Sequence, residues 1–383
     1  MIRELGCKVL LITGELSGDL YGSLLVRRIR EKSPYFHFVG IGGPKIRNLG
    51  IEMLFSAESL SLVGIPTFSD FKKYWFVYQT LKEFLRQRKI DLVILIDFPG
   101  FNLRIANLAK KMGYPVIYYV APQVWAWHKR RIKILKKSVD RLYVILPFEK
   151  EFFSAYGINT LFLGHPLLDI VKSYLSEEIF FEIYKLDPQL PLVSFFPGSR
   201  DGEIKRHLPL FIEVFKNLKK KQPKVQGIMV KASGLSEHYL WQEAKKYLTV
   251  VEDSQYDILK YSTVSLLASG TITLEAAIME TPSIVTYSLP SWVYFLAKKL
   301  IKVPYISLPN LILGKEVYPE ILQEKGKVES LVKKLEEYLE DSSLRERVKK
   351  ELVQIKQKIG PKGASWRIAE DMLKYISTLK LHR

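Results

Sequence analysis

Two segments in the C-terminal half of the chain combine residue types that bind phosphate groups. The first, Pro197-Gly198-Ser199-Arg200, follows the apolar run Leu192–Phe196 and precedes a helical pattern. Backbone N–H groups at a helix start, together with the positive end of the helix dipole, attract phosphate. Arginine adds a forked donor that matches two phosphate oxygens. For this segment alone, an ordinary strand-to-helix loop remains the alternative.

The second segment, Ser269-Gly270-Thr271, follows the apolar run Val264–Ala268. Its hydroxyl and N–H groups suit a diphosphate at another helix start. Glu275 follows about one helical turn later, where a carboxylate can accept hydrogen bonds from both ribose hydroxyls of a nucleotide. The alternative for Glu275 is a capping role, reaching back to the N–H groups near Thr271 and Ile272. The two segments together indicate a nucleoside diphosphate site.

The N-terminal half offers a candidate base and a small polar loop. Asp97 ends the apolar run Leu92–Ile96, where a carboxylate can act as a general base or can be purely structural. The loop contains Gly14, Ser17, Gly18 and Asp19, which suit close approach by a phosphorylated or polar ligand on the acceptor side. It does not match G-x-G-x-x-G, so a dinucleotide site is disfavoured.

Strands and helices that alternate along the chain must position these residues. Short β-branched runs such as Val9–Thr13 alternate with longer helical stretches, and the pattern restarts after His165. This alternation predicts an α/β protein with two Rossmann-like, doubly wound domains facing a cleft, whose ligands bind at the carboxyl ends of the strands. The expected organisation is an N-terminal domain over 1–168, a C-terminal domain over 169–355 and a helical segment over 356–383 that packs back on the first domain.

Composition and net charge indicate in which cellular compartment the protein works and what kind of partner it binds. The chain has 383 residues, which is long enough for two domains, and a single cysteine, which excludes an internal disulfide and fits a reducing compartment. No run approaches the roughly 18–20 apolar residues of a membrane span, and we expect no signal peptide. A net charge of +18 indicates an anionic partner, such as a membrane surface or phosphorylated substrates. The chain shows neither zinc-finger spacing nor an RNA-binding signature, so no nucleic acid is expected.

Two segments mix aromatic residues with lysines. They are Val63–Tyr78 and Trp292–Lys302. Such a mixture is typical of a helix at a bilayer interface with anionic headgroups, and it is equally compatible with a core-facing helix that has a solvated edge.

Taken together, these features resemble the lipid-A-disaccharide synthase family. V-x-P-x-V-W-A-W at Val120–Trp127 and S-L-P-N at Ser307–Asn310 are the specific motifs. The resemblance covers nearly the whole chain and includes Gly14–Asp19, Gly42-Gly43-Pro44, Ile96–Pro99, Tyr119–Trp127, Leu146–Glu149, Gly164-His165-Pro166, Pro197–Arg200, Ser269–Glu275 and Ser307–Asn310.

The resemblance implies a GT-B glycosyltransferase that needs no metal or other cofactor. It implies transfer of 2,3-diacylglucosamine from UDP to the 6-hydroxyl of 2,3-diacylglucosamine 1-phosphate, with inversion at the anomeric carbon. It also implies an intertwined homodimer that is peripheral on the cytoplasmic face of the inner membrane. By position, Asp97 matches the family's likely base, Arg200 its diphosphate arginine, and Asn310 an asparagine important for activity.

Two positions depart from the family pattern, because Gly100 and Thr67 stand where relatives often have aspartate and glutamate. Two other functions stay open at this point. One is a UDP-sugar epimerase or hydrolase of the same fold, and the other is a non-catalytic, basic, membrane-binding protein.

Overall fold

The computed structural model describes residues 6–57, 68–87, 89–125, 130–236, 239–289, 303–322 and 326–381. The chain divides into two compact units. Unit 1 comprises Met1–Asp169 and Ile359–Arg383, and unit 2 comprises Ile170–Lys358. In the parts of the chain that the structure describes, no helix is long and apolar enough to cross a bilayer.

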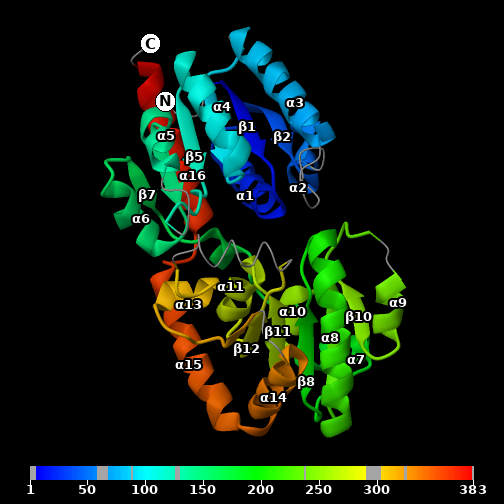
Figure 1. The fold of residues 1–383 in the computed structure, drawn as a ribbon. Helices are drawn as coiled ribbons and strands as arrows, with labels where there is room; N and C mark the ends of the chain where they lie inside the picture. Colours follow the sequence, from blue (N-terminus) through cyan, green and yellow to red (C-terminus); the bar gives the residue numbers. More distant parts are fainter. Residues whose placement is uncertain are drawn as a thin grey trace. The chain divides into compact units, whose positions relative to one another are not determined.

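Unit 1 is built around a parallel sheet (Figure 1). In sheet order, its strands are β3 (Glu52–Ser56), β2 (Phe36–Gly42), β1 (Cys7–Thr13), β4 (Leu92–Ile96), β5 (Val116–Tyr119), β6 (Arg141–Val144) and β7 (Thr160–Phe162). All five residues of β4 are buried, as expected for a continuous apolar run in a sheet that is covered on both faces. The order of winding reverses between β1 and β4, so unit 1 has its topological switch point there.

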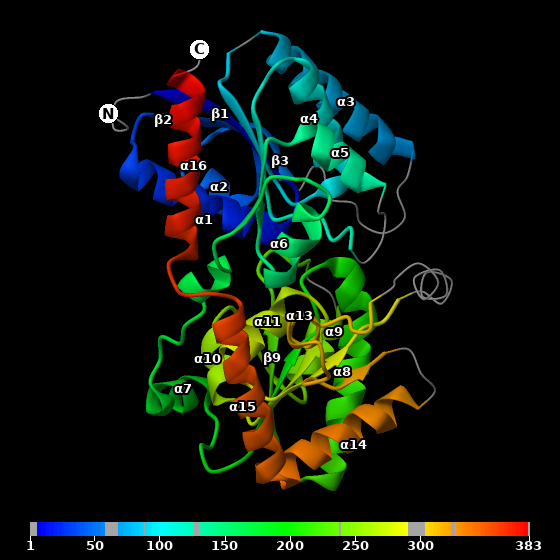
Figure 2. The ribbon, with the colours of Figure 1, turned by 90° about the vertical axis from the view of Figure 1, so that its left-hand side faces the viewer.

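Helices cover both faces of this sheet, as Figure 2 shows. On one face lie α3 (Phe68–Arg86), α4 (Pro99–Lys111) and α5 (Arg131–Ser138), and on the other lie α1 (Leu16–Lys32), α2 (Pro44–Arg47) and α16 (Ala364–Leu381). The short helices α6 (Pro147–Ser154) and η3 (Pro166–Asp169) complete the unit. The last helix, α16, packs along α1, where the Arg28 guanidinium lies 4.6 Å from the centre of the Trp366 ring.

Unit 2 repeats the same topology. In sheet order, its parallel strands are β10 (Thr249–Glu252), β9 (Gln226–Lys231), β8 (Leu192–Phe196), β11 (Val264–Ala268), β12 (Ser283–Thr286) and β13 (Glu320–Ile321). On one face pack α8 (Asp201–Lys221), α9 (Tyr239–Lys245) and α14 (Lys327–Glu340), and on the other α7 (Glu177–Tyr184), α10 (Gln255–Tyr261), α11 (Thr271–Ile278), α13 (Leu308–Leu313) and α15 (Ser342–Lys358). The switch point of unit 2 lies between β8 and β11.

The α/β fold class with two doubly wound parallel sheets is therefore confirmed, but some elements differ from those expected. The helix after β1 begins at Leu16, so Ser17, Gly18 and Asp19 lie in its first turn and not in a loop. Strand β3 has no counterpart among the expected elements. The C-terminal helical region breaks at Asp341 as well as between α15 and α16.

Candidate active site

The two phosphate-type segments of unit 2 leave neighbouring strands at the same edge of the sheet. Strand β8 pairs with β11 in parallel register, with Phe196 opposite Leu267. The segment Pro197–Arg200 follows β8, and Ser269–Thr271 follows β11, so both lie at the carboxyl edge and flank the switch point. Ligands of doubly wound sheets bind at this location.

Two hydrogen-bond donors of the first segment bind the carboxylate of Glu203, a residue of the following helix, α8. Arg200 is the N-cap of α8, and Gly198 has a φ of +126°, a conformation that favours glycine. The Ser199 N–H donates to Glu203 Oε2 at 3.0 Å, and the Arg200 guanidinium donates to Glu203 Oε1 at 3.3 Å. The sequence singled out Ser199 and Arg200 as donors to a phosphate, whereas here both donate to Glu203.

The second segment is held by its neighbours from both sides. The Ser269 N–H donates to the Thr286 carbonyl oxygen at 2.9 Å, and its hydroxyl donates to the Ile306 carbonyl oxygen at 3.1 Å. Gly270 caps α11, and Thr271 is the first residue of that helix. Among the residues that the structure describes, no atom lies within 4 Å of the point where a Cβ at Gly270 would be, so they leave the start of α11 open to a ligand at this side.

Glu275 lies in the second turn of α11 and is only 8% exposed. The carboxylate has no hydrogen bond to any described residue, so the expected alternative of a capping role does not occur among them. Burial raises the pKa of this carboxyl to about 7, because the charged form loses its hydration. A buried carboxylate that none of the described residues pairs with is suited to receive hydrogen-bond donors from a ligand.

Asn310 uses all its hydrogen-bonding capacity within unit 2. Its amide nitrogen donates to the Tyr318 carbonyl oxygen (2.7 Å) and to Glu320 Oε1 (2.9 Å). Its amide oxygen accepts from the N–H groups of Val317 (2.8 Å) and Tyr318 (2.9 Å). The side chain is fully buried and holds the segment 317–320, in which the same Glu320 oxygen also accepts from the Ser307 hydroxyl.

In unit 1, Asp97 occupies a strained backbone position at the switch point. Asp97 and Phe98 have φ values of +50° and +51°, in the left-handed region that non-glycine residues rarely adopt. The Asp97 carbonyl oxygen accepts hydrogen bonds from the Tyr118 hydroxyl at 2.6 Å and from the Asn102 amide at 2.8 Å. Val120, at the end of neighbouring β5, also has a positive φ of +62°. Strain that the surroundings maintain in this way is typical of functional sites.

The four residues predicted for the acceptor side have different surroundings in the structure. A Cβ added at Gly14 would lie 2.3 Å from the Phe98 ring, and one added at Gly18 would lie 3.8 Å from Asp97 Cβ. Ser17 is half-buried in the first turn of α1. Asp19 is buried, and its carboxylate accepts from three N–H groups at the start of α2, including that of Gly43 at 2.7 Å. Asp19 therefore stabilises the α1–α2 contact in this structure.

A buried glutamate follows β6, two strands away from Asp97 in the sheet. Glu149 is 1% exposed and accepts hydrogen bonds from the Trp125 indole N–H at 3.0 Å and from the Leu146 N–H at 3.1 Å. Burial raises the pKa of its carboxyl to about 7, and the negative charge of Asp97 adds to this shift. The Trp125 ring packs edge-on against Phe148, with ring centres 5.0 Å apart.

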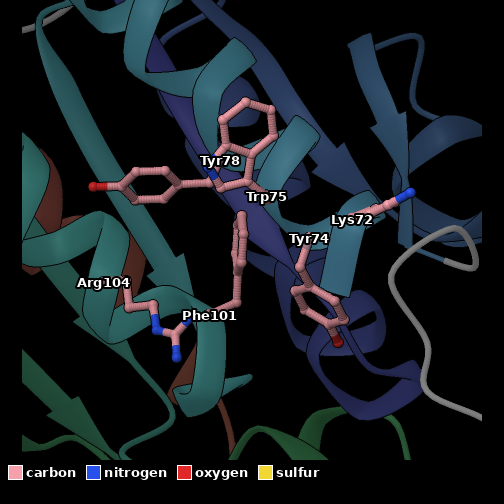
Figure 3. A pocket seen from close by; sticks show the side chains of 6 residues that line it. All are labelled: Lys72, Tyr74, Trp75, Tyr78, Phe101 and Arg104. Carbon is pink, nitrogen blue, oxygen red and sulfur yellow. The ribbon is translucent and has the colours of Figure 1, made fainter. Parts of the chain in front are cut away.

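A cavity of about 570 Å³ opens between α3 and α4 of unit 1 (Figure 3). Its walls are largely aromatic, and the ring of Tyr74 stacks on that of Phe98, next to Asp97, with centres 6.2 Å apart. In Figure 3 the rings of Phe101 and Tyr74 lie between the side chains of Arg104 and Lys72. The lining residues are Lys72, Tyr74, Trp75, Tyr78, Phe101 and Arg104.

Comparison with known proteins assigns the chain to a family. The family model described as lipid-A-disaccharide synthetase matches residues 9–369. A lipid-A-disaccharide synthase from Trichlorobacter lovleyi is 37% identical over 366 residues, covering 94% of this chain and 96% of the relative. One from Geobacter sulfurreducens is 34% identical over 380 residues, covering 98% and 99%. The chain belongs to the lipid-A-disaccharide synthetase family.

Solved structures share the fold at low sequence identity. The UDP-GlcNAc 2-epimerase from Neisseria meningitidis bound to UDP-GlcNAc has a TM-score of 0.66 at 12% identity, covering 96% of this chain and all of that one. The calicheamicin glycosyltransferase CalG4 has a TM-score of 0.60 at 15% identity, covering 97% and 98%. These likenesses establish the GT-B fold type for this member of the lipid-A-disaccharide synthetase family.

The sequence interpretation missed some residues of the site, and some residues that it singled out lie outside the described ranges. Glu203, Tyr118 and Glu149 were missed, although a glutamate three residues after a helix N-cap is a recognisable signal for the first of them. Thr67, the part of Val63–Tyr78 before residue 68, and Trp292–Lys302 lie outside the described residues. Within the described ranges, no three His, Cys, Asp or Glu side chains are grouped as metal ligands.

Proposed function

We propose that unit 2 binds the UDP-sugar donor through the segments that follow β8 and β11, and that unit 1 binds the acceptor beside Asp97. As a member of its family, the protein is a UDP-dependent glycosyltransferase of lipid A biosynthesis. Its substrates are a UDP-sugar and a sugar-phosphate acceptor. The observation that carries the proposal is the pairing of two phosphate-type segments on adjacent strands at a switch point.

In detail, the reaction is a single displacement between lipid substrates. The donor is UDP-2,3-diacylglucosamine, and the acceptor is 2,3-diacylglucosamine 1-phosphate. The Asp97 carboxylate takes the proton from the acceptor 6-hydroxyl while that oxygen forms a bond to C1 of the donor. The bond between C1 and the diphosphate oxygen breaks on the opposite side, and UDP leaves with the electron pair. The products are the β-linked disaccharide 1-phosphate and UDP.

The roles of the donor-side residues follow from their positions. The Arg200 guanidinium and the start of α11 at Ser269, Gly270 and Thr271 stabilise the charge of the departing diphosphate. The Glu275 carboxylate accepts hydrogen bonds from the ribose hydroxyls. Asn310 is a positioning residue, because its hydrogen bonds hold the segment 317–320 that follows α13. Glu320 of that segment accepts from the N–H groups of Ile306 and Ser307 before α13, and the Ile306 carbonyl oxygen accepts from Ser269.

The α3–α4 cavity provides a place for an acyl chain of the acceptor. Its aromatic walls are apolar, and its volume of about 570 Å³ lies within the range of about 300–1,000 Å³ that is usual for ligand pockets. Phe98 joins the cavity to Asp97, so an acyl chain placed there keeps its sugar next to the base. Lys72 and Arg104 carry charge that complements the 1-phosphate.

We also propose that helix α3 contacts an anionic membrane at the cytoplasmic face. Trp75 and Phe76 are 65% and 59% exposed beside Lys72 and Lys73, a mixture suited to a headgroup layer. Trp75→Ser with Phe76→Ser should reduce sedimentation with vesicles of zwitterionic and anionic phospholipid. Tyr239→Ser is the matched control, because Tyr239 is a 75%-exposed aromatic residue of unit 2. Equal loss with both variants would contradict this assignment.

A homodimer that exchanges its last helix is the proposed assembly. The contacts of α16 with α1 and η3 form one continuous interface within unit 1, and α16 follows a segment rich in glycine, Gly360–Gly363. The same interface would form if α16 came from a second copy. Light scattering of the purified protein should give twice the chain mass, and a monomer at all concentrations would exclude the exchange.

Product analysis tests the proposed reaction directly. The full-length protein is supplied with the UDP-linked diacylglucosamine, with and without diacylglucosamine 1-phosphate, and the lipids are analysed by mass spectrometry. We expect the disaccharide 1-phosphate and an equal amount of UDP, only when the acceptor is present. UDP release that ignores the acceptor would favour a hydrolase, and an isomerised donor would favour an epimerase.

A further inference from the structure

Glu203 is hydrogen-bonded to Pro197–Arg200, the segment that we propose to bind the donor diphosphate. Its two carboxylate oxygens accept from the Ser199 N–H (3.0 Å), from the Arg200 guanidinium (3.3 Å) and from the Tyr287 hydroxyl (3.3 Å). Glu203 thus holds two groups that a phosphate at this segment would also attract. A diphosphate and the Glu203 carboxylate are both negatively charged, so they compete for the same donors.

The two partners of the ion pair differ in how readily they can move. The side chain of Glu203 is 11% exposed and is held by three donors from two elements, whereas the side chain of Arg200 is 59% exposed. A Cβ added at Gly198 would lie 2.6 Å from Glu203 Oε2, so the backbone packs directly on this carboxylate. Glu203 is consequently the fixed member, and Arg200 is the one that can turn toward a ligand.

A second residue of α8, His207, also fixes the segment that contains Gly198. His207 lies one turn further along α8 and is fully buried. Its Nε2 accepts from the Ser288 N–H at 2.9 Å, so its Nδ1 carries the proton and donates to the Pro197 carbonyl oxygen at 2.9 Å. Both ends of the segment that includes Gly198 are therefore fixed to α8, one through His207 and the other through Glu203.

We propose that Glu203 is a positioning residue that holds Arg200 in a resting position and competes with the donor diphosphate for it. Arg200 turns from Glu203 to the diphosphate when the donor binds, and it returns to Glu203 when UDP leaves. Glu203 thereby weakens the binding of UDP and favours its release. This inference rests on the proposed donor site.

Calorimetric titration of the full-length protein with UDP tests the competition. Glu203→Gln keeps the shape of the side chain but removes its charge, so the ion pair between Glu203 and Arg200 is lost. The Arg200 end of this pair is exposed to solvent, so its contribution should resemble that of a surface ion pair, and we expect UDP to bind about 1.5- to 5-fold more tightly. A carboxylate that only supported the segment would have the opposite effect, since its loss would weaken UDP binding.

Two controls isolate the effect. Glu336→Gln removes the same charge from an ion pair with Lys221, at the other end of α8 and about 27 Å along its axis; UDP binding should be unchanged. In an Arg200→Ala background, Glu203→Gln should no longer tighten UDP binding, because there is no arginine to release. Uridine, which lacks phosphates, should bind all variants equally.

The outcomes separate this inference from the donor site itself. If Arg200→Ala leaves the UDP affinity unchanged, the proposed donor site is wrong, whatever Glu203 does. If Arg200→Ala weakens UDP binding but Glu203→Gln does not strengthen it, only the competition is wrong.

Discussion

Burial of Glu275 makes the stability of unit 2 depend on pH, and Glu275→Gln removes this dependence. The folded state raises the pKa of this carboxyl from 4.5 to about 7, so the folded state binds a proton more tightly than the unfolded state does. The stabilisation linked to this proton is fully present below pH 4.5 and is lost as the pH rises through 7.

The size of the effect follows from the two pKa values. Each unit of pKa difference corresponds to about 1.4 kcal/mol, so the full difference is about 3 kcal/mol. Between pH 5 and pH 8 the free energy of unfolding of unit 2 should fall by about 2.5 kcal/mol more in wild type than in Glu275→Gln. This is less than the full difference because part of the titration lies below pH 5. Other groups titrate in both proteins and cancel in this comparison.

Hydrogen exchange provides the assay, because the slowest amides of β8 and β11 report the unfolding of unit 2 by itself. The opening free energy is measured for wild type and Glu275→Gln at several values between pH 5 and pH 8. Parallel profiles would refute the reasoning, since they would mean that Glu275 is hydrated or partnered when the unit is folded. If the carboxylate also binds the ribose, UDP affinity of wild type should rise with pH relative to the variant.

Three further predictions concern activity and local stability. Asp97→Asn should lower kcat by about 10²–10⁴-fold, while the hydrogen bonds of the Asp97 carbonyl oxygen with Tyr118 and Asn102 remain; a near wild-type rate would remove Asp97 as the base. Asn310→Ala should lower the free energy of unfolding of unit 2 by about 2–4 kcal/mol, because two buried N–H groups lose their acceptor; unchanged denaturant midpoints would contradict this. Asp169→Ala should destabilise unit 1 by about 1–2 kcal/mol, because its carboxylate accepts from Gly363 and Ser365 at the start of α16, and calorimetry of the variant measures this loss.

Strand interiors were predictable because their signal is local. Leu92–Ile96, Leu192–Phe196 and Val264–Ala268 are strands with the expected limits, since short, mainly apolar segments bounded by turn residues are typical of buried parallel strands. The start of α1 was not predictable in the same way. Gly18 and Gly22 have low helix propensity, yet a Cβ at Gly22 would lie 2.9 Å from Ile46, so packing against α2 requires glycine inside this helix.

The sequence by itself determined the residue types that follow the strands, and with them the family and the prediction of a phosphate site. Only the tertiary structure decided which of these residues are neighbours. Pro197–Arg200 and Ser269–Thr271 are about 70 residues apart and meet because β8 pairs with β11, an order that depends on long-range packing. The engagement of Arg200 by Glu203, the enclosed amide of Asn310 and the left-handed backbone of Asp97 likewise depend on contacts that no local pattern records.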